Sequence, residues 1–415
     1  MRQMLDRLLT RLIRQGGLSV IWPNGERSSY GPDKNSPVTI KIAHDRMVRQ
    51  FVLHPGLAIG EAYMDGSLAP VDCNIYQVLE VLLSNLQAAG IAAVPTLKGR
   101  ILAGTMVRRL RQINSTVRAR RNVAHHYDLN GRLYSLFLDR DRQYSCAYFR
   151  TGTETLEEAQ TAKKHHIAAK LKLDRPGLTV LDIGCGWGGM ALTLARDYGA
   201  RVTGITLSTE QLNEARARAE AEGLSDRVKF ELLDYRAVRE TYDRVVSVGM
   251  FEHVGVNHYR TFFNVLKRVL KPDGVALLHT IGRSDGPGTT NSWIAKYIFP
   301  GGYSPALSET MLPIEKSGLL VTDVEILRLH YAETLRHWRR RFAANRDAIS
   351  TLYDERFCRM FEFYLAGSEL AFRYQEHVNF QIQITREQTA APLTRDYITE
   401  VERERLRAHE PAMSD

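Results

Sequence analysis

The sequence predicts an α/β fold in which a main domain with a mainly parallel seven-stranded sheet follows a smaller α+β domain. At 415 residues with 44% hydrophobic content, the chain is long enough for two domains. From Thr179 onward, short apolar runs alternate with helical patterns, whereas residues 17–95 begin with strand-like alternation. Strands separated by helices form parallel sheets covered on both faces, and ligands bind at the carboxyl ends of such strands.

The smaller domain is predicted to span residues 1–95. Strands are expected in SVIWPNGERSSYG and VTIKIAH, with a tight turn at Asn24 and Gly25, and a helical pattern containing GEAYMDG follows. The chain begins with an amphipathic helix whose apolar positions are Leu5, Leu8, Leu9 and Leu12.

A basic segment, residues 96–121, follows this domain. From Leu97 to Arg121 it contains eight lysines and arginines and no acidic residue. We interpret it as a linker or an interdomain helix with a cationic face, although a merely solvated basic helix fits the same pattern.

The main domain is predicted over residues 122–395, with a C-terminal tail at 396–415. Helices are expected at 188–199, 208–223 and 258–270. The seven expected strands are 179–184, 201–207, 228–234, 242–250, 274–282, 321–331 and 379–387.

Composition bounds the location of the protein. The formal net charge of +9 favours anionic surfaces, either phospholipid headgroups or nucleic acid. No stretch approaches the roughly 18 apolar residues of a membrane span, and the N-terminus lacks the apolar core of a signal peptide. The four cysteines form no CxxC pair, which argues against a zinc site and a disulfide framework. We therefore expect a cytoplasmic protein with only peripheral membrane contact.

The glycine loop in VLDIGCGWGG follows the first strand of the main domain. Gly184, Gly186 and Gly189 satisfy GxGxxG, which is compatible with a nicotinamide dinucleotide or with S-adenosylmethionine. A dinucleotide site needs an acidic residue at the end of the next strand, but that strand ends at Thr206 without one. This favours S-adenosylmethionine, with Thr206 and Gln211 sharing the ribose contacts.

Further motifs flank the loop in a fixed order: HHYDLNGRLYSLFLD, QYSCAYF, GMFEHVG, LLHTIG and LHYAETLRHW. Together with LDIGCGWGG they resemble the cyclopropane fatty acid synthase family, over about residues 120–390. The resemblance implies a Rossmann-like class I methyltransferase fold, with residues 1–95 as a lipid-handling domain. It also implies S-adenosylmethionine bound by Tyr127, Tyr144, Ser145, Asp182, Gly184, Cys185, Gly186, Gly188, Thr206, Leu207, Ser208, Gln211, Asp234 and Tyr235.

The same resemblance implies a bound bicarbonate ion. The family holds this ion with residue types that match Cys146, Glu252, His279, Ile281 and Tyr331. In this interpretation Glu252 accepts a hydrogen bond from bicarbonate, while His279, Tyr331 and the Ile281 amide donate to it.

The implied reaction is methyl transfer to a cis double bond of an unsaturated phospholipid acyl chain, followed by proton loss to bicarbonate and closure of a cyclopropane ring. The intermediate carbocation requires aromatic walls. For these we expect Tyr144, Tyr148, Phe149, Phe251 and Tyr331.

Alternatives remain at this point. Relatives with the same motifs make methyl-branched or otherwise methylated acyl chains. Nucleic-acid methylation is disfavoured because no Asn-Pro-Pro-Tyr motif or RNA-binding module is present. The substrate is expected at an anionic membrane. The N-terminal helix, the basic segment or the apolar loop Trp293–Tyr303 would contact that membrane, although the loop fits an ordinary packed connection equally well. A homodimer is compatible with the sequence.

Overall fold

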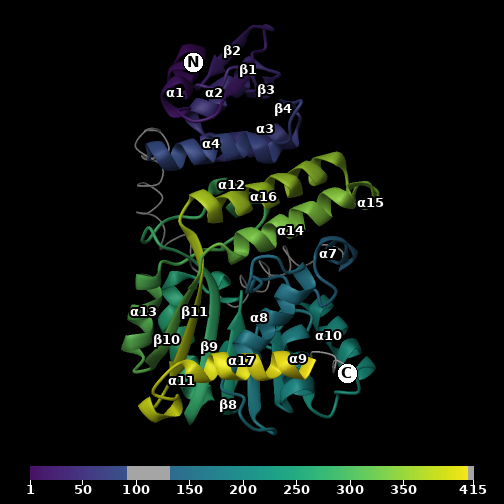
Figure 1. Ribbon diagram of the computed structural model, residues 1–415, viewed down its shortest axis with the longest axis vertical. Helices are drawn as coiled ribbons and strands as arrows, with labels where there is room; N and C mark the ends of the chain where they lie inside the picture. Colours follow the sequence, from purple (N-terminus) through teal and green to yellow (C-terminus); the bar gives the residue numbers. More distant parts are fainter. Residues whose placement is uncertain (91–130, 410–415) are drawn as a thin grey trace, which may run out of the picture. The chain divides into compact units, whose positions relative to one another are not determined.

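The computed structural model describes residues 1–90 and 131–409, with backbone only for 405–409 (Figure 1). The basic segment 96–121, Tyr127 and residues 410–415 of the tail therefore lie outside the described residues. The described chain divides into two compact units. Unit 1 contains residues 1–90, Gly288–Pro300 and Ala332–His377, and unit 2 contains 131–287, Gly301–Tyr331 and 378–409.

Unit 1 is built on a four-stranded sheet in the order β2-β1-β3-β4. Strand β1 pairs antiparallel with β2 and parallel with β3. The predicted turn is present, since Gly25 has a positive φ of 86° and its amide donates to the Trp22 carbonyl at 2.8 Å. The strands are β1 (Leu18–Ile21), β2 (Arg27–Tyr30), β3 (Val38–Ile42) and β4 (Leu68–Val71).

Helices complete unit 1, and the predicted N-terminal helix is confirmed. It buries Leu5, Leu9 and Leu12 against the sheet. The helices are α1 (Arg2–Leu12), α2 (Asp45–Leu53), α3 (Pro55–Met64), α4 (Ile75–Ala89), α12 (Ser292–Tyr297), α15 (Arg346–Ser350), α16 (Glu355–Tyr374) and all but the first two residues of α14 (His330–Ala344).

Two late segments thus group with the N-terminal domain, which differs from the predicted continuous boundaries. Ala366 and Leu370 of α16 are wholly buried in the unit 1 core. Trp293 of α12 packs edge-on against Phe363 at 4.7 Å and is 1% exposed. Of the two interpretations of the Trp293–Tyr303 loop, the packed connection is therefore the right one at Trp293.

Unit 2 contains the predicted seven-stranded, mainly parallel sheet, in the order β10-β11-β9-β8-β5-β6-β7. The pairs from β9 through β8, β5 and β6 to β7 are parallel, and β10 and β11 are antiparallel. The strands are β5 (Thr179–Ile183), β6 (Arg201–Thr206), β7 (Val228–Leu232), β8 (Tyr242–Val248), β9 (Leu270–Arg283), β10 (Leu320–Leu327) and β11 (His377–Thr385).

Helices cover both faces of this sheet (Figure 1). On one face α8 (Leu156–Lys170), α9 (Gly189–Tyr198) and α10 (Thr209–Ala221) share a core, and α17 (Asp396–His409) contacts α8. On the other face α11 (Tyr259–Val269) and α13 (Leu307–Lys316) pack. Helix α7 (Gly131–Phe137) begins the described part of unit 2.

The position of α9 depends on glycine at its N-cap. Gly188 has a φ of +85°, and a Cβ there would lie 2.7 Å from the Phe230 ring. Gly223 has a similar φ of +65° but no atom within 4 Å of the added Cβ.

We predict that Gly188→Ala lowers the free energy of unfolding by about 3 kcal/mol, because left-handed strain and overpacking add together. The matched Gly223→Ala carries only the strain and is expected to cost about 1 kcal/mol. Urea denaturation of both variants measures the difference. Equal losses would show that the contact with Phe230 is not what requires glycine.

Candidate active site

The glycine loop connects β5 to α9 at the carboxyl edge of the sheet. Gly184, Gly186 and Gly188 all have positive φ angles, of 84°, 55° and 85°, which side-chain-bearing residues rarely adopt. The amides of Gly184 and Cys185 both donate to the Ile205 carbonyl of β6, at 2.9 and 3.0 Å. The loop is thus fixed to the neighbouring strand and can approach a ligand without an intervening side chain.

A pocket opens at this edge, between the loop and the ends of β6, β7 and β8. Its walls combine apolar side chains such as Ile183, Leu207 and Met250 with a few polar groups, as is usual for small-molecule sites. Eleven of the residues predicted to bind S-adenosylmethionine line it: Tyr144, Ser145, Asp182, Gly184, Cys185, Gly186, Thr206, Leu207, Gln211, Asp234 and Tyr235.

Two residues predicted to bind the cofactor do not line the pocket but cap the helices beside it. Gly188 is the N-cap of α9, and Ser208 is the N-cap of α10, where its side chain accepts from the Gln211 amide. Gln143, Trp187 and His253 also line the pocket and were not predicted from the sequence. Each adjoins a predicted residue, so sequence neighbourhood was the available signal.

Thr206 and Gln211 are joined, because the Thr206 hydroxyl donates to Gln211 Oε1 at 2.8 Å. Both lie in the pocket wall at the end of β6, where a dinucleotide site would place its acid. The Asp234 carboxylate forms an ion pair with Arg236 at 2.7 Å. That pairing occupies part of the Asp234 acceptor capacity.

Asp182 is the buried carboxyl group of the pocket. It is 2% exposed, and no described residue hydrogen-bonds to its Oδ2. Burial raises the pKa of Asp182 to about 7, and the positive charge of Lys163 acts in the opposite direction. Burial also raises the pKa of the adjacent Cys185 thiol. A cationic ligand group would stabilise the ionised carboxyl.

Glu252 and Ile281 are brought together as predicted, but in a different arrangement. The Ile281 amide donates to Glu252 Oε1 at 2.6 Å, so this donor holds the carboxyl group instead of facing a ligand. No described residue hydrogen-bonds to the buried Oε2. Burial raises the pKa of Glu252 to about 7. Its neighbour His253 lines the pocket.

His279 differs from its predicted role as a donor to an ion. Its two ring nitrogens lie 3.1 Å from the side-chain amides of Asn379 and Gln381 on β11. The ring is 1% exposed, and burial holds its pKa well below the usual range, so it is neutral. Both ring nitrogens are therefore engaged by the chain itself.

Cys146 and Tyr331 are both buried, at 0% and 7% exposure. The Cys146 thiol donates to the Ala147 carbonyl at 3.3 Å. His330, directly before Tyr331, accepts at Nδ1 from the Phe149 amide at 3.0 Å, which ties the start of α14 to the segment that follows Cys146. This contact involves the residue before Tyr331 and the residue three positions after Cys146.

The predicted aromatic walls are only partly present. Tyr144 lines the pocket. Phe251 instead is wholly buried in the core and stacks on Tyr259 at 4.2 Å. Tyr148 stacks on His166 and His330, at 4.1 and 5.0 Å, and is not among the lining residues. Apolar neighbours sequester the Phe251 ring from the site.

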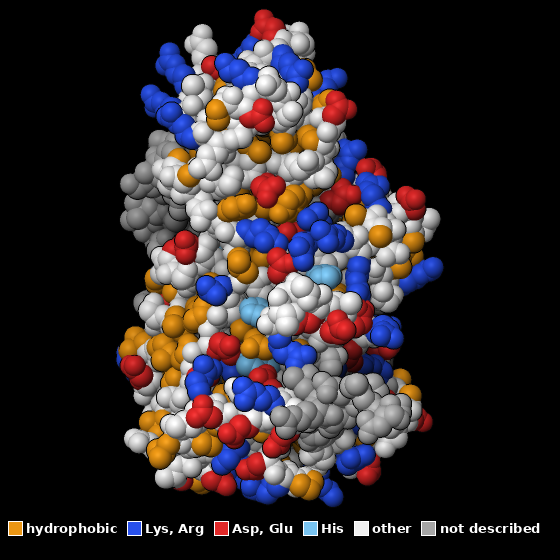
Figure 2. Space-filling model, viewed as in Figure 1, with side chains coloured by type: hydrophobic (Ala, Val, Ile, Leu, Met, Phe, Trp, Pro, Cys, Tyr) orange, Lys and Arg blue, Asp and Glu red, His pale blue; other side chains and the backbone are white. Residues whose placement is uncertain are grey.

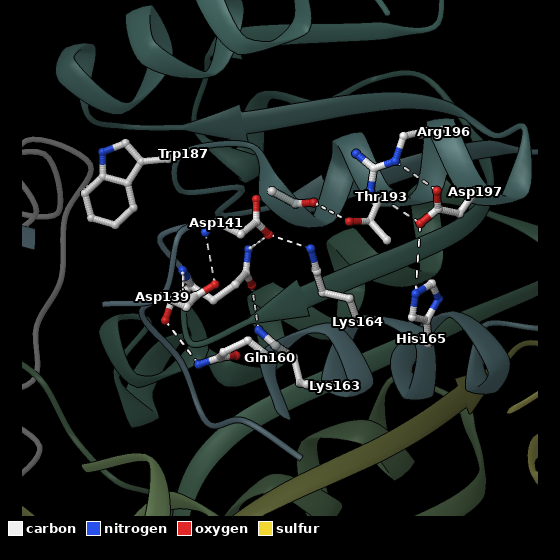
Figure 3. A network of polar contacts seen from close by, with 12 residues as sticks. Asp139, Asp141, Gln160, Lys163, Lys164, His165, Trp187, Thr193, Arg196 and Asp197 are labelled. Atoms are coloured by element: carbon white, nitrogen blue, oxygen red, sulfur yellow. Dashed lines mark hydrogen bonds and ion pairs between the residues drawn. The ribbon is translucent and has the colours of Figure 1, made fainter. Parts of the chain in front are cut away.

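A polar network supports the pocket from behind (Figure 3). Asp141 accepts from Lys164 at 2.6 Å and forms an ion pair with Arg218, which also donates to the Trp187 carbonyl at 2.8 Å. Gln143 Nε2 donates to Asp141 Oδ2 at 3.0 Å. The network therefore joins the glycine loop to the wall that carries Gln143.

A mainly parallel seven-stranded sheet with this pocket at the glycine loop defines the class: the protein is an S-adenosylmethionine-dependent methyltransferase. A mycolic acid cyclopropane synthase CmaA1 structure complexed with SAH and CTAB aligns with a TM-score of 0.60 and 35% identity, covering 64% of this chain and 97% of that one.

The family follows from the sequence comparisons. The model of the mycolic acid cyclopropane synthetase family matches residues 114–382, and a domain family of unknown function matches residues 4–89. The chain belongs to the mycolic acid cyclopropane synthetase family. It is 38% identical to the cyclopropane-fatty-acyl-phospholipid synthase of Escherichia coli K12, over 87% of this chain and 91% of the relative. It is 36% identical to the tuberculostearic acid methyltransferase UfaA1 of Mycobacterium tuberculosis, over 89% and 87%.

The raised pKa of Glu252 yields a stability prediction. A carboxyl group whose folded pKa exceeds its unfolded value favours folding only while protonated, so its contribution is lost as pH rises from about 4.5 to about 7. Glu252→Gln should therefore be more stable than the wild type by up to about 3 kcal/mol at pH 8 and nearly equal at pH 4.

Denaturation at both pH values measures this difference. Glu220→Gln, at an exposed position of α10, is the control and should show no pH-dependent gain. A Glu252→Gln protein that is less stable at pH 8 would show that the buried carboxylate is fully compensated.

Proposed function

We propose that the protein transfers the methyl group of S-adenosylmethionine to a cis double bond of an unsaturated phospholipid acyl chain and closes a cyclopropane ring. S-adenosylmethionine-dependent lipid modification follows from the family. The observation that carries the finer proposal is the buried Glu252 carboxyl group, with one oxygen held by the Ile281 amide and the other without a partner among the described residues. Ring closure needs a base near the transferred methyl group, because a proton must leave it, and a buried carboxyl group of this kind can hold bicarbonate in that place.

The pocket residues bind and orient the methyl donor. The glycine loop approaches it closely, Thr206 and Gln211 meet the ribose, and Asp182 meets the ammonium group at its amino-acid end. When bound, S-adenosylmethionine supplies an electrophilic methyl group. An alkene is a weak nucleophile, so close alignment and exclusion of water are the main contributions of the chain. Tyr144 lines the pocket and supplies an aromatic face for the cationic stage.

The proposal includes bound bicarbonate, but the surrounding residues have different roles from those predicted from the sequence. When bound, it would supply a small, replaceable base. Glu252 Oε2 is the buried polar atom that fits such an ion, and Cys146 and Tyr331 remain as further contacts. The Ile281 amide orients Glu252, and His279, held by the β11 amides, is a structural support. A carboxyl group that titrates near neutral pH can hold bicarbonate in either protonation state.

A methyl-branched product is the second candidate. The relative UfaA1, named as a tuberculostearic acid methyltransferase, covers nearly the same share of this chain at nearly the same identity as the E. coli synthase. Both candidates require the same methyl transfer and differ in the fate of the carbocation: ring closure takes a proton from the transferred methyl group, whereas a saturated methyl branch requires a hydride from an external reductant. The product therefore separates them.

We also propose peripheral association with the inner face of the cell membrane. Among residues 1–90 and 131–409, no helix is long and apolar enough to cross a bilayer. Figure 2 shows Lys and Arg side chains gathered over the part of unit 1 that carries α1. On that helix Arg7 and Arg11 are exposed next to Met4, which is 51% exposed. Basic and apolar groups on one helix suit an anionic lipid surface.

Expression in a bacterium that lacks its own synthase should produce cyclopropane fatty acids, seen as high-field methylene signals in proton NMR and as a mass gain of one methylene. Glu252→Gln should reduce this yield by at least about 100-fold, because bicarbonate would no longer be held in place as the general base. Methyl or methylene branches in place of rings would select the second candidate. Undiminished yield from Glu252→Gln would refute the role of Glu252.

Co-sedimentation with liposomes tests the membrane proposal. Binding should need anionic lipid and weaken with salt, and Arg7→Glu with Arg11→Glu should weaken it about 10-fold or more, at about 1 kcal/mol lost per cation. The control is the charge-matched pair Arg201→Glu and Arg260→Glu, exposed on unit 2, which should bind nearly as the wild type does. Equal losses from both pairs would assign the effect to net charge.

A further inference from the structure

Lys163 is a buried cation that the proposed mechanism does not use. It lies on α8 and is 0% exposed. Its ammonium group donates to Gln143 Oε1 at 2.6 Å and to Ser145 Oγ at 2.8 Å. Burying an ammonium group is costly unless it is paired, and here both hydrogen-bond acceptors are neutral. Burial lowers the pKa of Lys163 to about 8, and the charges of Asp139 and Asp141 act in the opposite direction, so the ammonium group carries its charge below about pH 8. A purely structural position would be filled more cheaply by an uncharged residue.

Both acceptors belong to the wall of the cofactor pocket. Gln143 and Ser145 line it, on either side of Tyr144. The Gln143 amide has a fixed orientation, because its nitrogen donates to Asp141 and its oxygen accepts from Lys163 (Figure 3). One turn earlier on α8, Gln160 donates to the Ser145 carbonyl at 2.9 Å. Helix α8 therefore holds this wall through side chain and backbone together.

The wall has no room to shift toward α9. A Cβ on Gly189 would lie 2.4 Å from Gln143 Nε2 and 2.5 Å from Asp141 Oδ2. The position of the Lys163 ammonium is thus fixed by close packing as well as by hydrogen bonds.

The nearby pocket carboxyl group lacks a partner of its own. Asp182 Oδ2 is buried without a hydrogen bond from any described residue. Ser145, which accepts from Lys163, lines the same pocket as Asp182, and among the described residues the positive charge of Lys163 favours the ionised carboxyl group. An opposite charge nearby favours the ionised form of a carboxyl group, which burial disfavours.

We propose that Lys163 is a positioning residue of the cofactor pocket: its ammonium group fixes the Gln143–Ser145 wall and keeps the Asp182 carboxyl group ionised for the ammonium end of the methyl donor. This rests on the proposed role of Asp182, which is tested separately below. The titratable and charged groups that act on or are acted on by Lys163 are Asp139, Asp141, Cys146, Lys164, Asp182 and His279.

The test is calorimetric binding of S-adenosylhomocysteine between pH 6 and pH 9, which is independent of the lipid acceptor. Lys163→Met and Lys163→Gln should shift the pH midpoint of binding upward by about one unit and weaken binding at pH 7 about fivefold. Lys163→Gln retains a hydrogen-bond donor for Ser145 and so separates charge from hydrogen bonding. Lys316→Met removes the same charge at an exposed position of α13, away from the pocket network, and should leave the midpoint unchanged.

Thermal unfolding of each variant verifies that it is folded. A loss of affinity by the same factor at every pH, or an equal shift in Lys316→Met, would overturn the electrostatic role. Asp182→Asn should bind weakly with no midpoint in this range. If Asp182→Asn instead binds as the wild type does, the role of Asp182 is wrong, whatever lipid product the enzyme makes.

Discussion

The site depends on the burial of two carboxyl groups at the carboxyl edge of a parallel sheet. Asp182 lies near the end of β5, Glu252 follows the adjacent parallel strand β8, and they are 2% and 8% exposed. Burial raises the pKa of each to about 7. Each also has one oxygen without a hydrogen bond from the described residues. The fold therefore supplies two carboxyl groups that a ligand can stabilise, and it accepts a stability cost to do so.

Other residues of unit 2 reduce the stability cost of burying the two carboxyl groups. The Ile281 amide fixes one oxygen of Glu252, and Lys163 supplies the positive charge that Asp182 needs. Glycines with positive φ bring the loop backbone to the pocket, and Phe230 packs where a Cβ of Gly188 would stand. The fate of the carbocation formed by methyl transfer then decides between a ring and a branch, and the chain is similar to relatives named for each kind of product.

Local patterns predicted much of this arrangement. The seven strands follow from hydrophobic periodicity and the glycine loop from a short motif, because their geometry is set by residues close in sequence. Most of the cofactor-pocket residues came from the family resemblance. Contacts between residues far apart in the sequence could not be predicted in this way. The side-chain amides that contact His279 belong to Asn379 and Gln381 of β11, 100 and 102 positions later. The packing of α12 and α16 with the N-terminal domain is likewise long-range. The burial of Lys163 was not predicted, because a lysine on a polar helix usually faces solvent.

The most direct test uses purified protein, vesicles of unsaturated phospholipid and S-adenosylmethionine with a trideuterated methyl group. Ring closure removes one deuteron from that methyl, so the account predicts a cyclopropane acyl chain that retains two deuterium atoms. A product that retains all three on a methyl branch would contradict ring closure at this site, and absence of label from the acyl chains would contradict the lipid acceptor itself.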